Sequence, residues 1–480
     1  MTHVDDCDIN RAPKSHVRQD DAMDQKSKQV PGMECSLSYS FSDQGGQVRA
    51  SGQARARVKE ESLAILPEAG ETLFLSLRDI LEISEADYRI HLPLSSGEEL
   101  TLFNVGYQYQ DLLRNISQLR NEMLLKDILM NEKLRKSGVQ AEFVYLDETG
   151  KEKQRGKCEP RLYETGIVLM PEKGELTRIP YSDILEISGE DYTFTMTSEF
   201  GEKLILSKMG SQFDSFRKII SDSINGLALK VQSSLKELFP EADPTIIRKA
   251  ARFMREGKAA RRSDIESLSP ELWKRLEMQL EIAGLKEEFG FLKSLSQQDR
   301  ICIGFKRGLM GDLTGDYLWF LIPIYSTNSK DPGNAVAMEA ASEDGGGKAT
   351  YFFRIVSRRD YPNLKNIQDM HREVDNFIKV INRCMLAINF RREPIYLSDE
   401  KLADPQYTRY RFAIQKLPTL RTLRSLFIGR VIHSSPEQWK QDVADLLKFN
   451  VTTLDDSVRW AKAMTSPEAI DDIAKPAPGP

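Results

Sequence analysis

The chain has few of the residues that build metal sites and disulfides. It contains 5 cysteines and 5 histidines in 480 residues, and both types are scattered along the sequence. Because no two cysteines form a C-x-x-C pair, we expect no structural zinc, and such isolated cysteines are typical of a reducing compartment. The sequence therefore predicts neither a metal site nor a cofactor.

Long apolar runs are also missing. The longest, YLWFLIPIY at residues 317–325, is too short for a membrane-crossing helix, which needs about 20 residues. The N-terminal segment carries acidic residues where a signal peptide has its apolar core. We predict a cytoplasmic protein without a transmembrane segment, with a disordered lead at residues 1–33.

Nucleotide-binding and catalytic signatures do not stand out either. The triple glycine at 345–347 lacks the G-x-x-x-x-G-K-[ST] pattern of a phosphate-binding loop, and the glycine-rich stretch at 304–316 fits no dinucleotide fingerprint. Ser434 and Ser435 follow His433, but their place before a helical pattern is typical of helix caps. We predict no catalytic residue, and we expect that the chain is not an enzyme.

Charge is unevenly distributed along the chain. The net charge is −5, but residues 52–227 contain 22 Lys/Arg and 30 Asp/Glu, whereas residues 300–450 contain 23 and 17. An acidic front half and a basic rear half either attract one another or face different partners.

One segment of the sequence occurs twice. RDILEISEADY at residues 78–88 returns as SDILEISGEDY at 182–192, and the offset of 104 residues holds well beyond both segments. For example, PEAGE at 67–71 matches PEKGE at 171–175. The front half is therefore predicted to be an internal duplication.

Each copy changes its hydrophobic period at the same point. Apolar residues first alternate with polar ones, as in half-buried strands, and then follow helical spacing from Tyr109 or Phe213 onward. The alternating residues are Tyr88, Ile90, Leu92 and Leu94 in the first copy, and Tyr192, Phe194 and Met196 in the second. Each copy is predicted to be a run of short antiparallel strands closed by one amphipathic helix.

This element order, together with the segment IPYSDILEI at 179–187, resembles the pleckstrin-homology-like (PH-like) superfold, including its GRAM-type members. The resemblance implies that each copy is a bent antiparallel sandwich whose open corner is filled by the closing helix. It also implies that the copies provide binding surfaces. One departure is that many members carry a tryptophan in the closing helix, where this chain has Tyr109 or Phe213 on the apolar face.

Most residues shared by the copies have a structural explanation. Gly97 and Gly201 are expected to adopt positive φ in a hairpin, and Gly106 and Gly210 to allow a sharp turn from strand to helix. We expect the shared aspartates to hydrogen-bond local backbone at turns and the shared glutamates to lie on the outward face of a strand. These acids are Asp79, Asp183, Asp87, Asp191, Glu82 and Glu186.

The copies differ at the first predicted hairpin of the second copy, DETGKEKQRGK at 147–157. If this stretch is extended, the cations at its alternate positions project from one face; they are Lys151, Lys153, Arg155 and Lys157. Converging cations suit a phosphate group. Phosphoinositide-binding members of the resembling superfold carry Lys-x-Arg in a basic first hairpin, which Lys153 and Arg155 match. The alternative is a solvated hairpin without a ligand.

Residues 228–298 show helical periodicity, with predicted caps at Asp243 and Ser269 that each precede a proline. A basic stripe is predicted in this segment, with members Arg248, Arg252, Arg255, Arg261 and Arg262. The stripe either meets a phosphate or an acidic partner, or it faces solvent or the acidic repeats of the same chain.

The rear of the chain, residues 299–450, is predicted to be a separate α+β domain. Helices are expected at 366–390 and from Ser434 onward, and strands at 317–325, 334–342, 348–357, 393–397, 409–415 and 425–433. Cations and aromatics mix at 409–415, as on nucleic-acid platforms, although an ordinary strand with a charged outer face has the same pattern.

The fold class predicted from these patterns is an α+β multidomain protein with two duplicated PH-like antiparallel β-sandwiches. Its parts are a disordered lead at 1–33, repeats at 34–136 and 137–227, a helical segment at 228–298, an α+β domain at 299–450 and a C-terminal helix or tail at 451–480. We expect a non-enzymatic interaction or scaffold protein whose repeats bind a protein partner or, as second choice, an anionic lipid head group at a peripheral membrane contact. The alternatives are a nucleic-acid-associated protein acting through the basic rear domain, and an enzyme with its site in residues 300–450.

Overall fold

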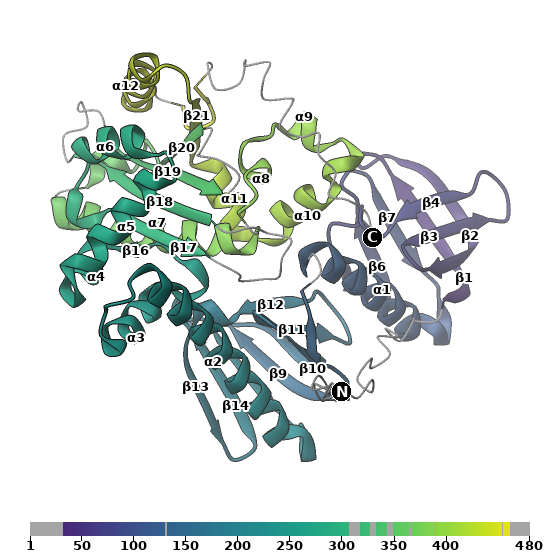
Figure 1. Ribbon diagram of the computed structural model, residues 1–480. Coiled ribbons are helices and arrows are strands. Elements are labelled where there is room, and N and C mark those ends of the chain that lie inside the picture. Colours follow the sequence, from purple (N-terminus) through teal and green to yellow (C-terminus); the bar gives the residue numbers. More distant parts are fainter. Residues whose placement is uncertain are drawn as a thin grey trace, which may run out of the picture.

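The structure is a computed structural model that describes residues 32–129, 132–306, 317–326, 333–342, 349–364, 366–388, 390–453 and 455–460. Figure 1 shows three parts that meet near the centre of the molecule: the first repeat in purple, the second in blue and teal, and the rear of the chain in green to yellow. Residues 1–31 of the predicted lead and the glycine-rich segments at 307–316 and 343–348 lie outside the described residues, whereas residue 33 of the predicted lead begins β1.

The first repeat is a curled sheet of seven antiparallel strands that packs against helix α1 (Tyr109–Leu129). Its spatial order is β4-β3-β2-β1-β7-β6-β5, so the first strand lies beside the last. The core of the repeat combines the alternate apolar positions of the strands with one face of α1, including Tyr109. The strands are β1 (Met33–Ser42), β2 (Val48–Lys59), β3 (Ser62–Pro67), β4 (Leu73–Ser76), β5 (Ser84–Ala86), β6 (Arg89–Pro93) and β7 (Glu99–Phe103).

The second repeat is built in the same way against helix α2 (Phe213–Leu238). Its order, β12-β11-β10-β9-β15-β14-β13, reproduces that of the first repeat, with β8 added beside β10. The strands are β8 (Leu134–Lys136), β9 (Ala141–Leu146), β10 (Glu152–Tyr163), β11 (Gly166–Pro171), β12 (Thr177–Pro180), β13 (Ile184–Glu190), β14 (Thr193–Ser198) and β15 (Lys203–Ser207).

The backbones of the two repeats agree in detail. Strands β10, β11, β12 and β15 begin and end 104 residues after β2, β3, β4 and β7. The predicted positive φ values are confirmed at Gly97 (86°) and Gly201 (90°), and Gly106 (69°) and Gly210 (56°) adopt positive φ as well. Both helices follow one 3-10 turn, η1 (Gly106–Gln108) or η3 (Gly210–Gln212), which provides the sharp change of direction. The predicted pair of antiparallel units, each closed by a helix, is therefore present.

Helix α2 is longer than α1 and connects the second repeat to the helical segment. Its C-terminal half packs on α3 (Pro244–Phe253), and the buried residues of both helices belong to one hydrophobic core that continues to the rear sheet. The side chains of Asp243 and Ser269 accept backbone N–H bonds as predicted. The remaining elements here are η2 (Tyr181–Asp183), η4 (Arg255–Gly257), α4 (Arg262–Leu268), α5 (Pro270–Ile282), α6 (Lys286–Ser294) and η5 (Gln298–Arg300).

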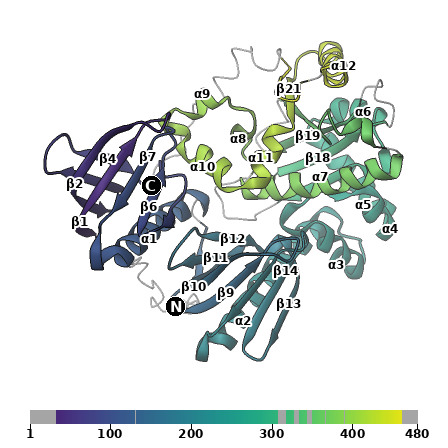
Figure 2. The same ribbon diagram turned by 180° about the vertical axis from the view of Figure 1, so that it is seen from behind.

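The rear of the chain forms a six-stranded antiparallel sheet between two helical layers. Helices α5, α6 and α12 (Pro436–Thr452) cover one face, while α7 (Ile367–Ala387) and α11 (Pro418–Ser425) cover the other, where Figure 2 shows α7 lying across the sheet. Because both faces are buried, β18 is apolar at nearly every position. The strands, in spatial order, are β16 (Ala260–Arg261), β17 (Cys302–Lys306), β18 (Tyr317–Ile324), β19 (Ala335–Ser342), β20 (Ala349–Arg354) and β21 (Phe427–Ile432).

Two strands predicted in the rear domain are helices instead. The segment at 393–397 contains α8 (Glu393–Tyr396), where Pro394 occupies the first turn, and the segment at 409–415 lies in α10 (Thr408–Lys416). Tyr410 is buried and Ile414 partly buried at helical spacing in one small cluster, so tertiary packing overrides the strand preference of these residues. The other short elements are η6 (Tyr361–Asn363), α9 (Asp399–Leu402) and η7 (Pro405–Tyr407).

Candidate functional site

The four cations of the predicted hairpin do not follow one regular alternation. All are exposed, on β10 or directly before it, but a β-bulge between Glu152 and Gln154 interrupts the alternation of side chains. Arg155 pairs with Glu152 at 2.8 Å, whereas the Nζ atom of Lys153 lies over the ring of Tyr145 at 5.7 Å. The bulge takes Lys153 out of the predicted alternation with Arg155, whereas Arg155 and Lys157 keep alternate positions on the regular part of β10. Anion binding by these four residues stays a prediction.

The predicted basic stripe is also divided, because α3 ends at Phe253. Arg248 and Arg252 are exposed on α3. The remaining three are partly buried and bonded within the chain: Arg255 to a carbonyl of the second repeat, Arg261 to Asp264 and Asp375, and Arg262 to Glu266.

A cluster of charged contacts lies instead at the repeated DIL segment. We call residues 79–81 and 183–185 the DIL turns. In the second repeat, Asp183 is 1% exposed and receives Lys258 Nζ at 3.1 Å and Arg383 Nε at 2.8 Å. Glu202 binds the same guanidinium at 2.6 Å. A carboxylate of the repeat is thus buried between a lysine before β16 and an arginine of α7.

Backbone carbonyls of the second DIL turn take part as well. Ser182 O accepts from Lys258 Nζ at 3.0 Å, and Ile184 O accepts from Arg255 Nη1 at 2.6 Å. The carbonyl of Asp183, between them, accepts from the backbone N–H of Glu199. The turn therefore acts as a multidentate acceptor for cations.

The first DIL turn is bound in the same manner by a different element. Arg411 of α10 lies 3.4 Å from Asp79, and Lys416 of α10 donates to Leu81 O at 2.7 Å. Arg120 of α1 donates to Ile80 O at 2.9 Å. Figure 1 shows α10 between the rear sheet and the first repeat. The expectation that these aspartates serve only local turns is therefore incomplete.

The aspartates of the two DIL turns differ in their exposure to solvent. Asp79 is 42% exposed, whereas Asp183 is 1% exposed. Beside the second turn, Glu256 is buried with a positive φ of 52°. Burial raises the pKa of this carboxyl to about 8, and the neighbouring charges of Arg178, Asp183 and Lys258 partly offset one another.

These contacts show that the acidic front half and the basic rear half of the chain attract one another, which is one of the two outcomes expected from the uneven charge. Arg383 was missed from the sequence because it lies in an amphipathic helix whose pattern predicts only core packing. The sequence did contain one signal: Arg383 has no acidic residue one helical turn away, so its ion-pair partner had to come from another element. The two DIL turns contact different helices of the rear domain, α10 and α7.

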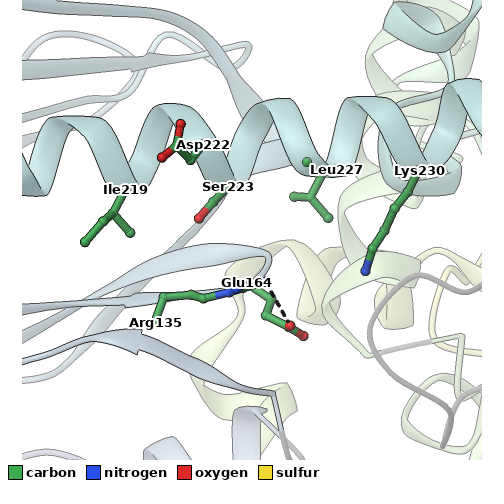
Figure 3. A pocket seen from close by; sticks show the side chains of 8 residues that line it. Arg135, Glu164, Ile219, Asp222, Ser223, Leu227 and Lys230 are labelled. Carbon is green, nitrogen blue, oxygen red and sulfur yellow. Dashed lines mark hydrogen bonds and ion pairs between the residues drawn. The ribbon is translucent and has the colours of Figure 1, made fainter. Parts of the chain in front are cut away.

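A groove of about 320 Å³ lies between α2 and the turn that follows β10 (Figure 3). Arg135 and Glu164 on one wall are paired at 3.2 Å, while Asp222 and Lys230 come from α2 on the other wall. Its charged groups are mixed in sign and one pair is already satisfied, so the groove favours no particular ligand class.

His433 takes part in a structural contact. Its Nε2 atom lies 2.9 Å from Glu339, and its Nδ1 atom 3.5 Å from Glu288. Burial lowers the pKa of His433, but the two carboxylates outweigh burial and raise the pKa above its ordinary value. Ser435 caps α12 by accepting from Gln438 N, which confirms the predicted cap. Because both ring nitrogens of this half-buried imidazole face carboxylates, neither faces the hydroxyl group of Ser434 or Ser435.

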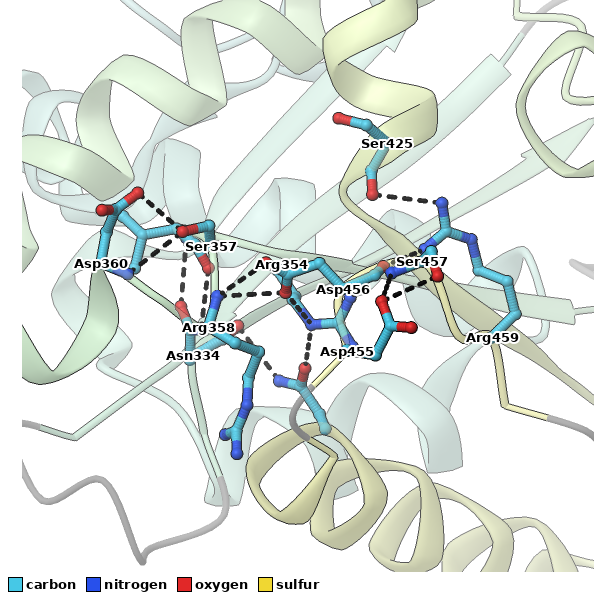
Figure 4. A network of polar contacts seen from close by, with 12 residues as sticks. Asn334, Arg354, Ser357, Arg358, Asp360, Ser425, Asp455, Asp456, Ser457 and Arg459 are labelled. Carbon is cyan, nitrogen blue, oxygen red and sulfur yellow. Dashed lines mark hydrogen bonds and ion pairs between the residues drawn. The ribbon is translucent and has the colours of Figure 1, made fainter.

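The C-terminal segment is fastened to the rear sheet by a second polar network (Figure 4). Arg354 is fully buried and donates to Asn450 at 2.8 Å and to Asp456 O at 3.0 Å. The carboxylate of Asp456 accepts from the backbone N–H of Arg358. These contacts hold residues 455–460 in place, and they belong to the architecture of the rear sheet.

No protein-family model matches the chain, and no curated protein matches it by sequence. In the described ranges, the structure places no three His, Cys, Asp or Glu side chains where they could hold a metal ion. Over the same ranges, none of the helices is long and apolar enough to cross a membrane.

Proposed function

We propose that the chain is a non-enzymatic interaction protein in which two PH-like repeats, held at defined positions on the rear domain, bind a protein partner. The observation that supports this most directly is an exposed tyrosine at the same position of both repeats. Tyr88 and Tyr192 are 79% and 71% exposed. Each lies in the two-residue turn before β6 or β14, which we call the aromatic turn.

The aromatic turns have an unusual backbone. Both residues of each turn adopt positive φ, at 49° and 58° for Asp87 and Tyr88 and at 49° and 56° for Asp191 and Tyr192. Such values are uncommon for bulky residues, and turns of this kind favour Asn and Gly. A tyrosine kept twice in this conformation supports a role for its side chain.

Both tyrosine rings are held in place although they are exposed. Tyr88 lies edge-to-face on Tyr109 with ring centroids 5.8 Å apart, and Tyr192 lies on Phe213 at 5.6 Å. A rigid aromatic side chain loses little entropy on binding, and tyrosine is enriched at the centres of protein interfaces. These features favour a protein partner over a lipid head group, since Lys153 does not alternate regularly with Arg155 and Arg155 is paired with Glu152.

The test is affinity purification of the full chain from cells that produce it, with partners quantified by mass spectrometry. Tyr88→Asn/Tyr192→Asn removes both rings but keeps a residue that tolerates positive φ. Phe74→Asn is the matched control, because Phe74 is 77% exposed on β4 without an aromatic counterpart in the second repeat. We expect the control to retain the partners of the natural chain and the double variant to lose them. Identical partners for the natural chain and the double variant would contradict the proposal.

A further inference from the structure

Two arginines of the rear domain lie over a neighbouring pair of tyrosine rings. Arg392 precedes α8, and Arg430 lies on β21 opposite Tyr351 of β20. Both are half-buried. Across the part of the chain that the structure describes, neither has an acidic side chain within ion-pairing distance. Nearby Arg411 and Arg424, by contrast, each pair with an aspartate, Asp79 and Asp399.

Tyrosine rings position both guanidinium groups. The Cζ atom of Arg430 lies 4.3 Å from the ring centre of Tyr396, and that of Arg392 lies 5.8 Å from the ring centre of Tyr351. The two rings are neighbours, with centroids 6.1 Å apart. An arginine over an aromatic face keeps its N–H edges available for a planar or tetrahedral anion. Arg392 uses one N–H for Ala340 O at 3.3 Å, which leaves most of its five donors.

The surrounding groups favour an anion. Burial raises the pKa of Tyr351 and of Tyr396, so both phenols remain neutral hydrogen-bond donors at physiological pH. The nearest acid, Glu393, adds to that rise by its charge. A third cation, Arg391, is directed to the hydroxyl of Tyr410 at 3.1 Å.

We propose that Arg392 and Arg430, together with the hydroxyl groups of Tyr351 and Tyr396, form a binding site for a phosphate monoester dianion. Two guanidinium groups match its two negative charges and its several acceptor oxygens. The half-buried position on β21 and before α8 suits one projecting phosphate group better than a long polyanion. A soluble phosphate monoester and a lipid head group that ends in a phosphate share this chemistry.

The first test is titration calorimetry of the full chain with inorganic phosphate, against chloride at the same ionic strength. We expect saturable binding that weakens by about tenfold or more in Arg392→Gln and in Arg430→Gln, because each loses charge-assisted hydrogen bonds. Arg421→Gln, an exposed arginine of α11, is the matched control and should bind as the natural chain does. Absence of saturable binding, or equal affinity in all variants, would overturn the proposal.

A second measurement keeps the test decisive if a glutamine variant misfolds. Broadening of the ³¹P resonance of inorganic phosphate by the natural chain supports the site, and its absence overturns it. Arg430→Lys retains the charge but not the planar set of N–H donors, so it should bind phosphate more weakly than the natural chain.

Phosphatidylcholine vesicles with and without phosphatidic acid distinguish a lipid head group from a soluble phosphate monoester. Vesicle binding displaced by free phosphate supports the lipid, and phosphate binding without vesicle binding supports the soluble group.

Discussion

Asp183 and Arg383 are separated by 200 residues in the sequence and joined by a 2.8 Å hydrogen bond between a repeat and the rear domain. Asp183 also receives Lys258, and almost none of its side chain reaches solvent. The matching aspartate of the first repeat, Asp79, meets Arg411 at 3.4 Å and remains partly exposed. The duplicated residue thus makes the same kind of contact twice at two levels of burial.

Asp183→Asn should destabilise the chain far more than Asp79→Asn. Removing one partner of a buried ion pair leaves uncompensated charges and costs about 3–5 kcal/mol, whereas an exposed pair contributes below about 1 kcal/mol. Thermal unfolding of both variants against the natural chain measures the difference. Equal shifts in the two variants would contradict the difference in burial on which the prediction depends.

High salt should loosen the first repeat from α10 before it loosens the second repeat. The pair between Asp79 and Arg411 is partly exposed and therefore screened by salt, while the buried contacts of Asp183 are screened much less. Amide hydrogen exchange at low and high salt is the measurement. We expect faster exchange in residues 77–82 and unchanged exchange in residues 181–186; the reverse order would refute the prediction.

Stability should fall as pH rises because of Glu256. Its pKa is raised to about 8 in the folded chain by burial, above the ordinary value that it regains on unfolding. Between these values the folded state holds the proton and the unfolded state does not, so the free energy of unfolding falls by up to about 1.4 kcal/mol per pH unit. The stability that the proton on Glu256 contributes is complete below the pKa of the unfolded state and is lost by pH 8.

Glu256→Gln tests that origin, because glutamine keeps the size and the polarity without titrating. Chemical unfolding between pH 5 and pH 8 should show a weaker fall for the variant, with the variant gaining relative to the natural chain as pH rises. Glu237→Gln, on the last turn of α2, is a control that should keep the natural slope. Parallel curves for Glu256→Gln and the natural chain would exclude this carboxyl as the source.

Lys153→Ala/Arg155→Ala should leave vesicle binding unchanged. Lys153 is the extra residue of the β-bulge and lies over Tyr145, whereas Arg155 follows the bulge and is paired with Glu152. Cosedimentation with vesicles that contain phosphoinositides provides the measurement, with Lys203→Ala, an exposed residue of β15, as control. Loss of vesicle binding in the double variant alone would restore the hairpin as a lipid site.

Local patterns predicted the parts of the fold that depend on local chemistry. The offset of 104 residues located both curled sheets, period-two alternation located their strands, and a cap followed by proline located α3 and α5. The same reasoning failed at 409–415, where Tyr and Phe suggested a strand, because contacts with residues far away in the chain select the helix. It failed again at Lys153, because a bulge depends on the partner strand.

The sequence by itself determined that the front half is a duplication and that an acidic front faces a basic rear, since both are properties of residue type and spacing. Only the tertiary structure decided which charges meet. Asp183 with Arg383, and Arg392 with Arg430, are brought together by the packing of separate elements, and burial sets the strength of each contact. Distance and burial in three dimensions have no counterpart in the spacing of residues along the chain.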